Sequence, residues 1–171
     1  SQFHPWWESR AWQMVLDEQS DMFINIGDNV YIDAIEIELK RLIWAQRLQN
    51  PCFAHVFSSI PSYSVYDDHE WEANDATPGT LPKLERDSQY LSWHWTVPNY
   101  IEGNPYYPGC YFKIKTGKTE FFFLDGRYYR NIGSTSDSDP GRQMLGVYQR
   151  EQMTKWIQES TAEFKILVNP V

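Results

Sequence analysis

The sequence lacks several features that mark particular classes of protein. Cys52 and Cys110 are the only cysteines among 171 residues, so at most one disulfide is possible, and nothing in the sequence says that they pair. No apolar run approaches the ~18 residues of a membrane-spanning helix. The formal net charge is -8 without any cluster of Lys and Arg, whereas a nucleic-acid surface needs a basic face. We therefore expect neither a membrane span nor a nucleic-acid-binding surface.

The chain also has no internal repeat, no low-complexity linker and no initiator Met at Ser1. A hydrophobic content of 42% and aromatic residues spread along the whole chain predict a real core and argue against disorder. We therefore expect residues 1–171 to form one domain or one part of a domain, with a processed, trimmed or truncated start.

The order of hydrophobic patterns predicts an α/β fold. Helical spacing occurs over residues 6–20 and 34–49, and short buried strands are predicted within 21–29 and 62–66. Helix and strand alternate, which is typical of a sheet with partly parallel strands flanked by helices. The loops at the carboxyl ends of such strands converge on one edge of the sheet.

The second half of the chain continues this pattern. A third helix is predicted over 83–95, and two apolar runs within 110–130 surround "TGKT", a hairpin signal in which Gly117 supplies positive φ. A loop over 131–143, a helix over 145–160 and a strand from 164 complete the prediction.

One stretch, "VYDDHEWEAND", combines four ionisable residues directly after a predicted strand: Asp67, Asp68, His69 and Glu70. Adjacent carboxylates repel one another, so the cluster is costly unless solvent or a bound cation compensates it. The earlier "FINIGDNVY" places Asp28 at the end of another strand. Both segments are also compatible with ordinary turns and solvated loops.

Together the motifs "GDNVY", "YDDHEWEANDA", "FFFLDGRYYR" and "MLGVYQREQMTKWIQES", in this order, resemble the PhoD-like alkaline phosphatase family of the calcineurin-like metallophosphatases. The resemblance covers most of the chain. It implies part of an αββα sandwich with a mixed β-sheet flanked by helices. It also implies hydrolysis of phosphate monoesters or diesters, with iron and calcium as metals and a small phosphate ester as substrate. Members of the family are commonly exported through a signal peptide.

The resemblance assigns roles to four residues. Asp28 is expected to bridge two metal ions, and Tyr31 matches a tyrosinate ligand of iron. Asp68 is expected to bind the second metal. His69 matches a histidine that donates a hydrogen bond to a phosphoryl or leaving-group oxygen.

Arg127 is the candidate for holding phosphate, because a guanidinium group matches phosphate oxygens bidentately. An ion pair with Asp125 or another neighbour is the open alternative, and Arg130 is a weaker candidate for phosphate. Asn29 is placed on the substrate-binding side, where it and Asn74 shape the loops around the ligands. The remaining histidines, which lack ligand spacing, are expected to be packing or surface residues: His4, His55 and His94.

The family's first ligand segment precedes the region that matches Ser1, and its later histidine ligand segments follow the region that matches Val171. We therefore expect this chain to be a fragment with little or no activity alone. Two alternatives stay open. One is an aromatic-rich ligand- or carbohydrate-binding module with a structural cation site. The other is a metal-free hydrolase with Asp28 or Asp68 as base and Glu70 as acid.

Overall fold

The computed structural model describes residues 5–28, 30–76, 109–131, 136 and 138–170. The predicted helix over 83–95, Asn29, His4 and His94 lie outside the described residues. The elements are α1 (Pro5–Asp17), β1 (Phe23–Ile26), α2 (Ile37–Arg47), α3 (Pro51–Ser59), β2 (Ser62–Val65), α4 (Asp68–Trp71), β3 (Phe112–Thr116), β4 (Thr119–Phe123), α6 (Val147–Glu159) and β5 (Phe164–Val168).

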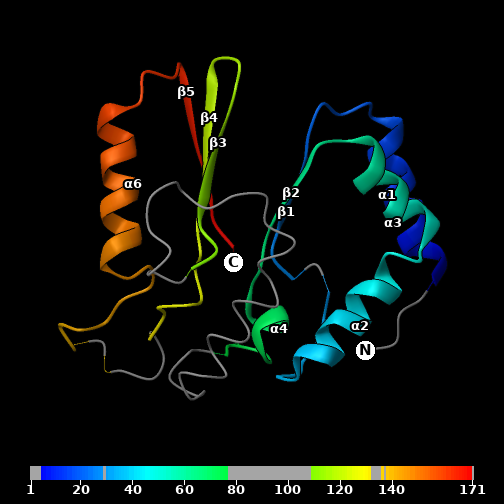
Figure 1. Cartoon of the computed structure of the whole chain (residues 1–171), viewed down its shortest axis with the longest axis horizontal. Coiled ribbons are helices and arrows are strands. Elements are labelled where there is room, and N and C mark those ends of the chain that lie inside the picture. Colours follow the sequence, from blue (N-terminus) through cyan, green and yellow to red (C-terminus); the bar gives the residue numbers. More distant parts are fainter. Residues whose placement is uncertain (1–4, 29, 77–108, 132–135, 137, 171) are drawn as a thin grey trace.

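The predicted α/β class, with both parallel and antiparallel strand pairs, is confirmed. β1 pairs with β2 in parallel, β3 and β4 form the predicted antiparallel hairpin, and β5 pairs with β4 in parallel. Gly117 in the hairpin turn has φ 54°. In Figure 1, α6 lies outside the β3–β4–β5 sheet, while α1, α2 and α3 lie on the far side of the β1–β2 sheet. This arrangement places two helical layers outside two sheets.

The sequence analysis missed α3, because Asn50-Pro51 serves two purposes. It ends the preceding helical segment, as predicted, and it also starts the next helix. Oδ1 of Asn50 accepts hydrogen bonds from the backbone N–H of Cys52 (3.0 Å) and Phe53 (3.3 Å). Proline is favoured in the first turn of a helix, where its missing N–H costs nothing.

Side chains from both sheets meet in one hydrophobic cluster. Val65 of β2 packs with Phe112 and Phe123 of the hairpin and with Val168 of β5. The rings of Phe112 and Phe123 stack with centroids 4.3 Å apart. Burial of these side chains stabilises the contact between the two sheets, at roughly 1.5–3 kcal/mol for each large apolar side chain.

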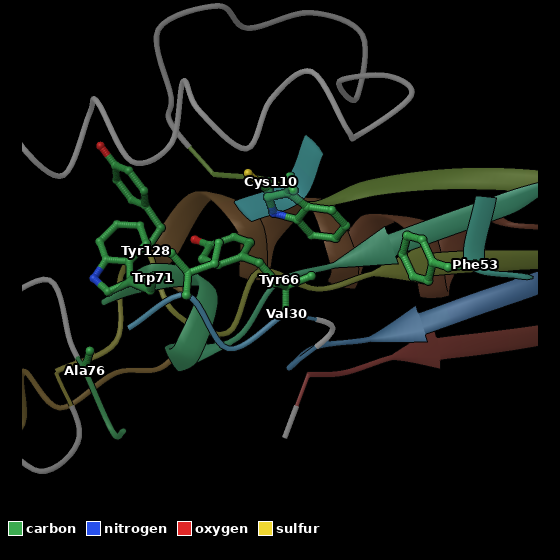
Figure 2. Close-up of a cluster of buried hydrophobic side chains, with 9 residues drawn as sticks. Val30, Phe53, Tyr66, Trp71, Ala76, Cys110 and Tyr128 are labelled. Atoms are coloured by element: carbon green, nitrogen blue, oxygen red, sulfur yellow. The ribbon is translucent and has the colours of Figure 1, made fainter. Parts of the chain in front are cut away.

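A second cluster lies at the carboxyl ends of β1 and β2. Figure 2 shows Val30, Tyr66, Trp71, Cys110 and Tyr128 packed together there. The cluster joins the loop after β1, the helix α4 and the segment after β4, so it holds in place the first three of the four motifs on which the family resemblance rests. Cys110 is buried in it as a free thiol, and Cys52 is also unpaired.

Within the described ranges, no helix has the length and apolar character needed to cross a membrane.

Candidate metal centre

The parallel register of β1 and β2 brings two distant acidic segments together. Ile26 pairs with Val65, so the residues that follow each strand emerge at the same sheet edge. Gly27 makes the close approach possible, because its φ is 106° and an added Cβ would lie 2.7 Å from Cβ of Asp67. Asp28 also has positive φ, at 50°.

Asp28, Asp68 and His69 offer ligand atoms that all lie within 4.8 Å of one another. Asp28 comes from the loop after β1, whereas Asp68 and His69 begin α4. The predicted convergence of the two motifs is therefore confirmed, although the sequence analysis treated "DDHE" as a loop rather than a helix start. Asp67 caps this helix, and its carboxylate and that of Glu70 form a capping box.

The electrostatics of this group fit a bound cation. Oδ1 of Asp28 is buried and has no hydrogen-bond partner among the described residues. Burial raises the pKa of Asp28, and the neighbouring charge of Asp68 raises it further. Burial also acts to raise the pKa of Asp68, but the backbone N–H of Asp75 and the charge of Arg127 outweigh it and lower the pKa. A cation would relieve the repulsion between the two carboxylates and supply the missing partner of Asp28.

Tyr31 lies beside the same group. Its hydroxyl is 3.4 Å from Oδ2 of Asp28, and its ring centroid is 4.1 Å from that of His69. The charge of Asp28 raises the pKa of Tyr31, so the phenol keeps its proton unless a cation intervenes. The residue is 44% exposed to solvent. Its role as an iron ligand stays a prediction.

Asp33 is a functional candidate that the sequence analysis missed. Its Oδ1 lies 2.5 Å from Nδ1 of His69, and the backbone N–H groups of Ile32 and Asp33 donate to the carbonyl of His69 at 3.2 Å. Burial lowers the pKa of His69, but the hydrogen bond to Asp33 and the charge of Asp28 outweigh it and raise the pKa. The only signal for Asp33 in the sequence was its position five residues after Asp28, in the same loop.

Arg127 is buried and already engaged by carboxylates. Its Nε donates to Asp67, and an NH2 nitrogen lies 3.7 Å from Oδ1 of Asp68. The ion pair that was left open as the alternative is thus present, with Asp67 rather than Asp125 as its main partner. Asp125 instead accepts a hydrogen bond from the backbone N–H of Arg127 at 3.0 Å. Phosphate binding by Arg127 stays a prediction.

Arg130 differs from Arg127 in having an unused donor. Its Nε is buried and makes no hydrogen bond within the part of the chain that the structure describes.

Asn74 is exposed and donates to Oδ2 of its neighbour Asp75 at 2.9 Å. His55, on α3, is exposed, and it does not belong to the group of described residues that could hold a metal ion.

Glu70 does not suit the role of a general acid in a metal-free hydrolase. Its side chain is buried, and both carboxylate oxygens accept hydrogen bonds from backbone N–H groups. Lys40 of α2, also missed by sequence analysis, is 3% exposed and donates from Nζ to the carbonyls of Glu70 (2.7 Å) and Trp71 (2.5 Å). Both groups therefore hold α4 in place rather than face a substrate.

Comparison with known proteins agrees with the geometry. Residues 40–171 match the family described as PhoD-like phosphatase. The chain belongs to this family. A solved structure described as "Structure of PhoD" matches with a TM-score of 0.76 and 22% sequence identity, over 93% of this chain and 38% of that one. At this identity the likeness shows the α/β fold, and the chain spans well under half of that PhoD structure. A comparison with curated proteins found no match.

Proposed function

We propose that the protein containing this PhoD-like segment hydrolyses phosphate monoesters or diesters in a metal-dependent reaction. The observation that carries the proposal is the convergence of Asp28, Asp68 and His69, with a buried carboxylate oxygen of Asp28 that lacks a partner. Metal ions held there supply positive charge that orients a phosphate and stabilises an in-line displacement at phosphorus.

Two kinds of residue contribute to the proposed site: those that offer ligand atoms to a metal and those that orient them. The carboxylates of Asp28 and Asp68 are the hard oxygen ligands, and Tyr31 offers its phenol oxygen beside them. Asp33 holds the ring of His69 through Nδ1, which leaves Nε2 to face a metal ion or the substrate.

The finer parts of the proposal concern metals, substrate and location. Iron and calcium are the metals, as the family resemblance implies, and the substrate is a small phosphate ester. Arg127, Arg130 and Asn29 are the candidates for contacts to its phosphate. The parent protein is exported, and the 171-residue segment alone has little activity, since a hard cation with few protein ligands binds weakly.

The test compares this chain with a longer one extended at both ends. Elemental analysis gives metal content, and turnover is measured with a phosphomonoester and a phosphodiester. We expect metal and turnover in the longer chain, with both lost in Asp28→Ala. Strong turnover by the short chain would contradict its expected low activity. Turnover that survives a strong chelator would contradict the metal-dependent reaction. Ligand binding without turnover, unchanged in Asp28→Ala and His69→Ala, would favour a binding module.

A further inference from the structure

Glu70 connects the two segments that carry the candidate metal ligands. Its side chain is buried, with 3% of the residue's surface exposed. Oε1 accepts a hydrogen bond from the backbone N–H of Val30 at 2.8 Å. Oε2 accepts one from Asp28 N–H at 3.1 Å and another from Asp67 N–H at 2.9 Å. A single carboxylate therefore accepts hydrogen bonds from the loop after β1 and from the segment after β2.

This arrangement fixes the relative position of two ligands. The N–H of Asp28 belongs to a ligand residue itself, and the N–H of Asp67 directly precedes the other ligand, Asp68. Because both donate to the same oxygen of Glu70, a shift of one segment relative to the other breaks a hydrogen bond. Charge-assisted hydrogen bonds of this kind are stronger than those between neutral groups.

The backbone of the Asp28 loop needs such support. Asp28 has φ 50° and Gly27 has φ 106°, so two successive residues take conformations that L side chains rarely adopt. The backbone N–H groups of Asp28 and Val30 donate to Glu70, which holds these two residues in place and directs the carboxylate of Asp28 toward Asp68 and His69.

We propose that Glu70 is a positioning residue of the metal centre, which sets the separation of Asp28 and Asp68 without touching metal or substrate. This role rests on the proposed function. A glutamine has nearly the same shape, but its NH₂ group would face at least one of the three N–H donors. Glu70→Gln therefore removes part of the connection while leaving the volume unchanged.

The experiment measures Mn²⁺ affinity by electron paramagnetic resonance on the longer chain described above, for the wild type, Glu70→Gln and Glu163→Gln. Glu163 is exposed and pairs with Lys118, so its variant is a control for loss of one negative charge. Circular dichroism confirms that each variant is folded. We expect Glu70→Gln to weaken Mn²⁺ binding about 10- to 100-fold, the usual effect of losing a group that orients metal ligands, and Glu163→Gln to leave it unchanged.

The outcomes separate the two proposals. Wild-type Mn²⁺ binding with an equal affinity in folded Glu70→Gln overturns the positioning role alone. A wild type that holds no metal by elemental analysis and binds no Mn²⁺ overturns the proposed function and the positioning role with it. If Glu70→Gln does not fold, amide hydrogen exchange in the wild type decides. Exchange at Asp28, Val30 and Asp67 that slows further on Mn²⁺ addition supports the role, whereas exchange insensitive to Mn²⁺ overturns it.

Discussion

Nδ1 of His69 lies 2.5 Å from Oδ1 of Asp33, which joins the start of α4 to the loop that follows β1. A carboxylate in this position favours the protonated imidazole and fixes the orientation of its ring. Asp33 itself has φ 50° and is held by its N–H bond to the carbonyl of His69. The two residues thus support each other through both side chain and backbone.

Replacing Asp33 by Asn is expected to lower the pKa of His69, because the variant loses the negative charge that stabilises the imidazolium. An NMR titration of the His69 ring protons measures this directly. In the longer chain we also expect turnover to fall about 10- to 100-fold. Asp21→Asn, at an exposed position, is the control. A His69 pKa that is the same in Asp33→Asn and wild type would show that Asp33 does not act on His69.

Replacing Asp28 by Asn is expected to stabilise the metal-free protein at neutral pH. Burial and the charge of Asp68 raise the pKa of Asp28 above its ordinary value of 3.8. Between that value and the raised pKa, the folded state binds more protons than the unfolded state. Its stability therefore falls as pH rises through this window, and the loss is complete at neutral pH. Asparagine also tolerates positive φ. Because the side chain is only partly buried and solvent screens it, we expect about 1 kcal/mol or less, a rise in Tm of about 2–4 °C at most.

Thermal unfolding of the longer chain at pH 7 measures this effect with and without Mn²⁺. In chelator the variant should melt above the wild type, whereas with Mn²⁺ only the wild type should gain stability, which reverses the order. A variant that melts below the wild type in chelator would contradict the argument that the Asp28 carboxylate destabilises the metal-free fold.

Removing the guanidinium of Arg127 is expected to destabilise the fold strongly. Arg127→Met leaves Asp67, itself buried, without its main partner, and breaking a buried ion pair in this way costs about 3–5 kcal/mol. Urea unfolding gives the free energy. The double variant Asp67→Asn/Arg127→Met should recover part of the loss. Equal stability of the single and double variants would show that the unpaired carboxylate of Asp67 does not cause the loss.

The phosphate-binding role of Arg127 is tested by the KM for the ester and by Mn²⁺ affinity rather than by stability. A folded Arg127→Lys variant of the longer chain keeps the charge but loses the guanidinium geometry. Direct contact with phosphate predicts a higher KM for the ester at unchanged Mn²⁺ affinity. A purely internal role toward Asp67 and Asp68 predicts weaker Mn²⁺ binding instead.

The contribution of Lys40 to stability is expected to depend on pH. Burial lowers its pKa from 10.5 to about 7, so between these values the unfolded chain binds the extra proton and the unfolding free energy rises with pH. Relative to Lys40→Met, the wild type should gain up to about 1.4 kcal/mol per pH unit in this window.

Urea unfolding of both proteins at pH 7, 8 and 9 checks this expectation. At every pH the Met variant should be less stable than the wild type, because two buried carbonyls lose their donor at a cost of about 1–3 kcal/mol each. A difference between the two proteins that stays constant with pH would indicate that Lys40 remains charged throughout.

The sequence by itself determined much of this protein's outline. The hydrophobic patterns predicted α1, β1, α2, β2, the β3–β4 hairpin, α6 and β5, because each pattern depends on local periodicity and turn chemistry. The strand-end positions of Asp28 and Asp68 predicted that the two would meet, since the carboxyl ends of parallel strands share a sheet edge.

Only the tertiary structure decided how the site is held together. Asp33 and Lys40 act through partners 36 and 30 residues away, and Glu70 joins its local partner Asp67 to residues 40 and 42 positions away; no local pattern contains these distant partners. It also showed that the Arg127 guanidinium faces Asp67 in the interior, a choice that sequence spacing left open. The physical reason is that hydrogen bonds and ion pairs between distant segments depend on how the sheets, loops and α4 pack, whereas periodicity records only which face of each element is buried.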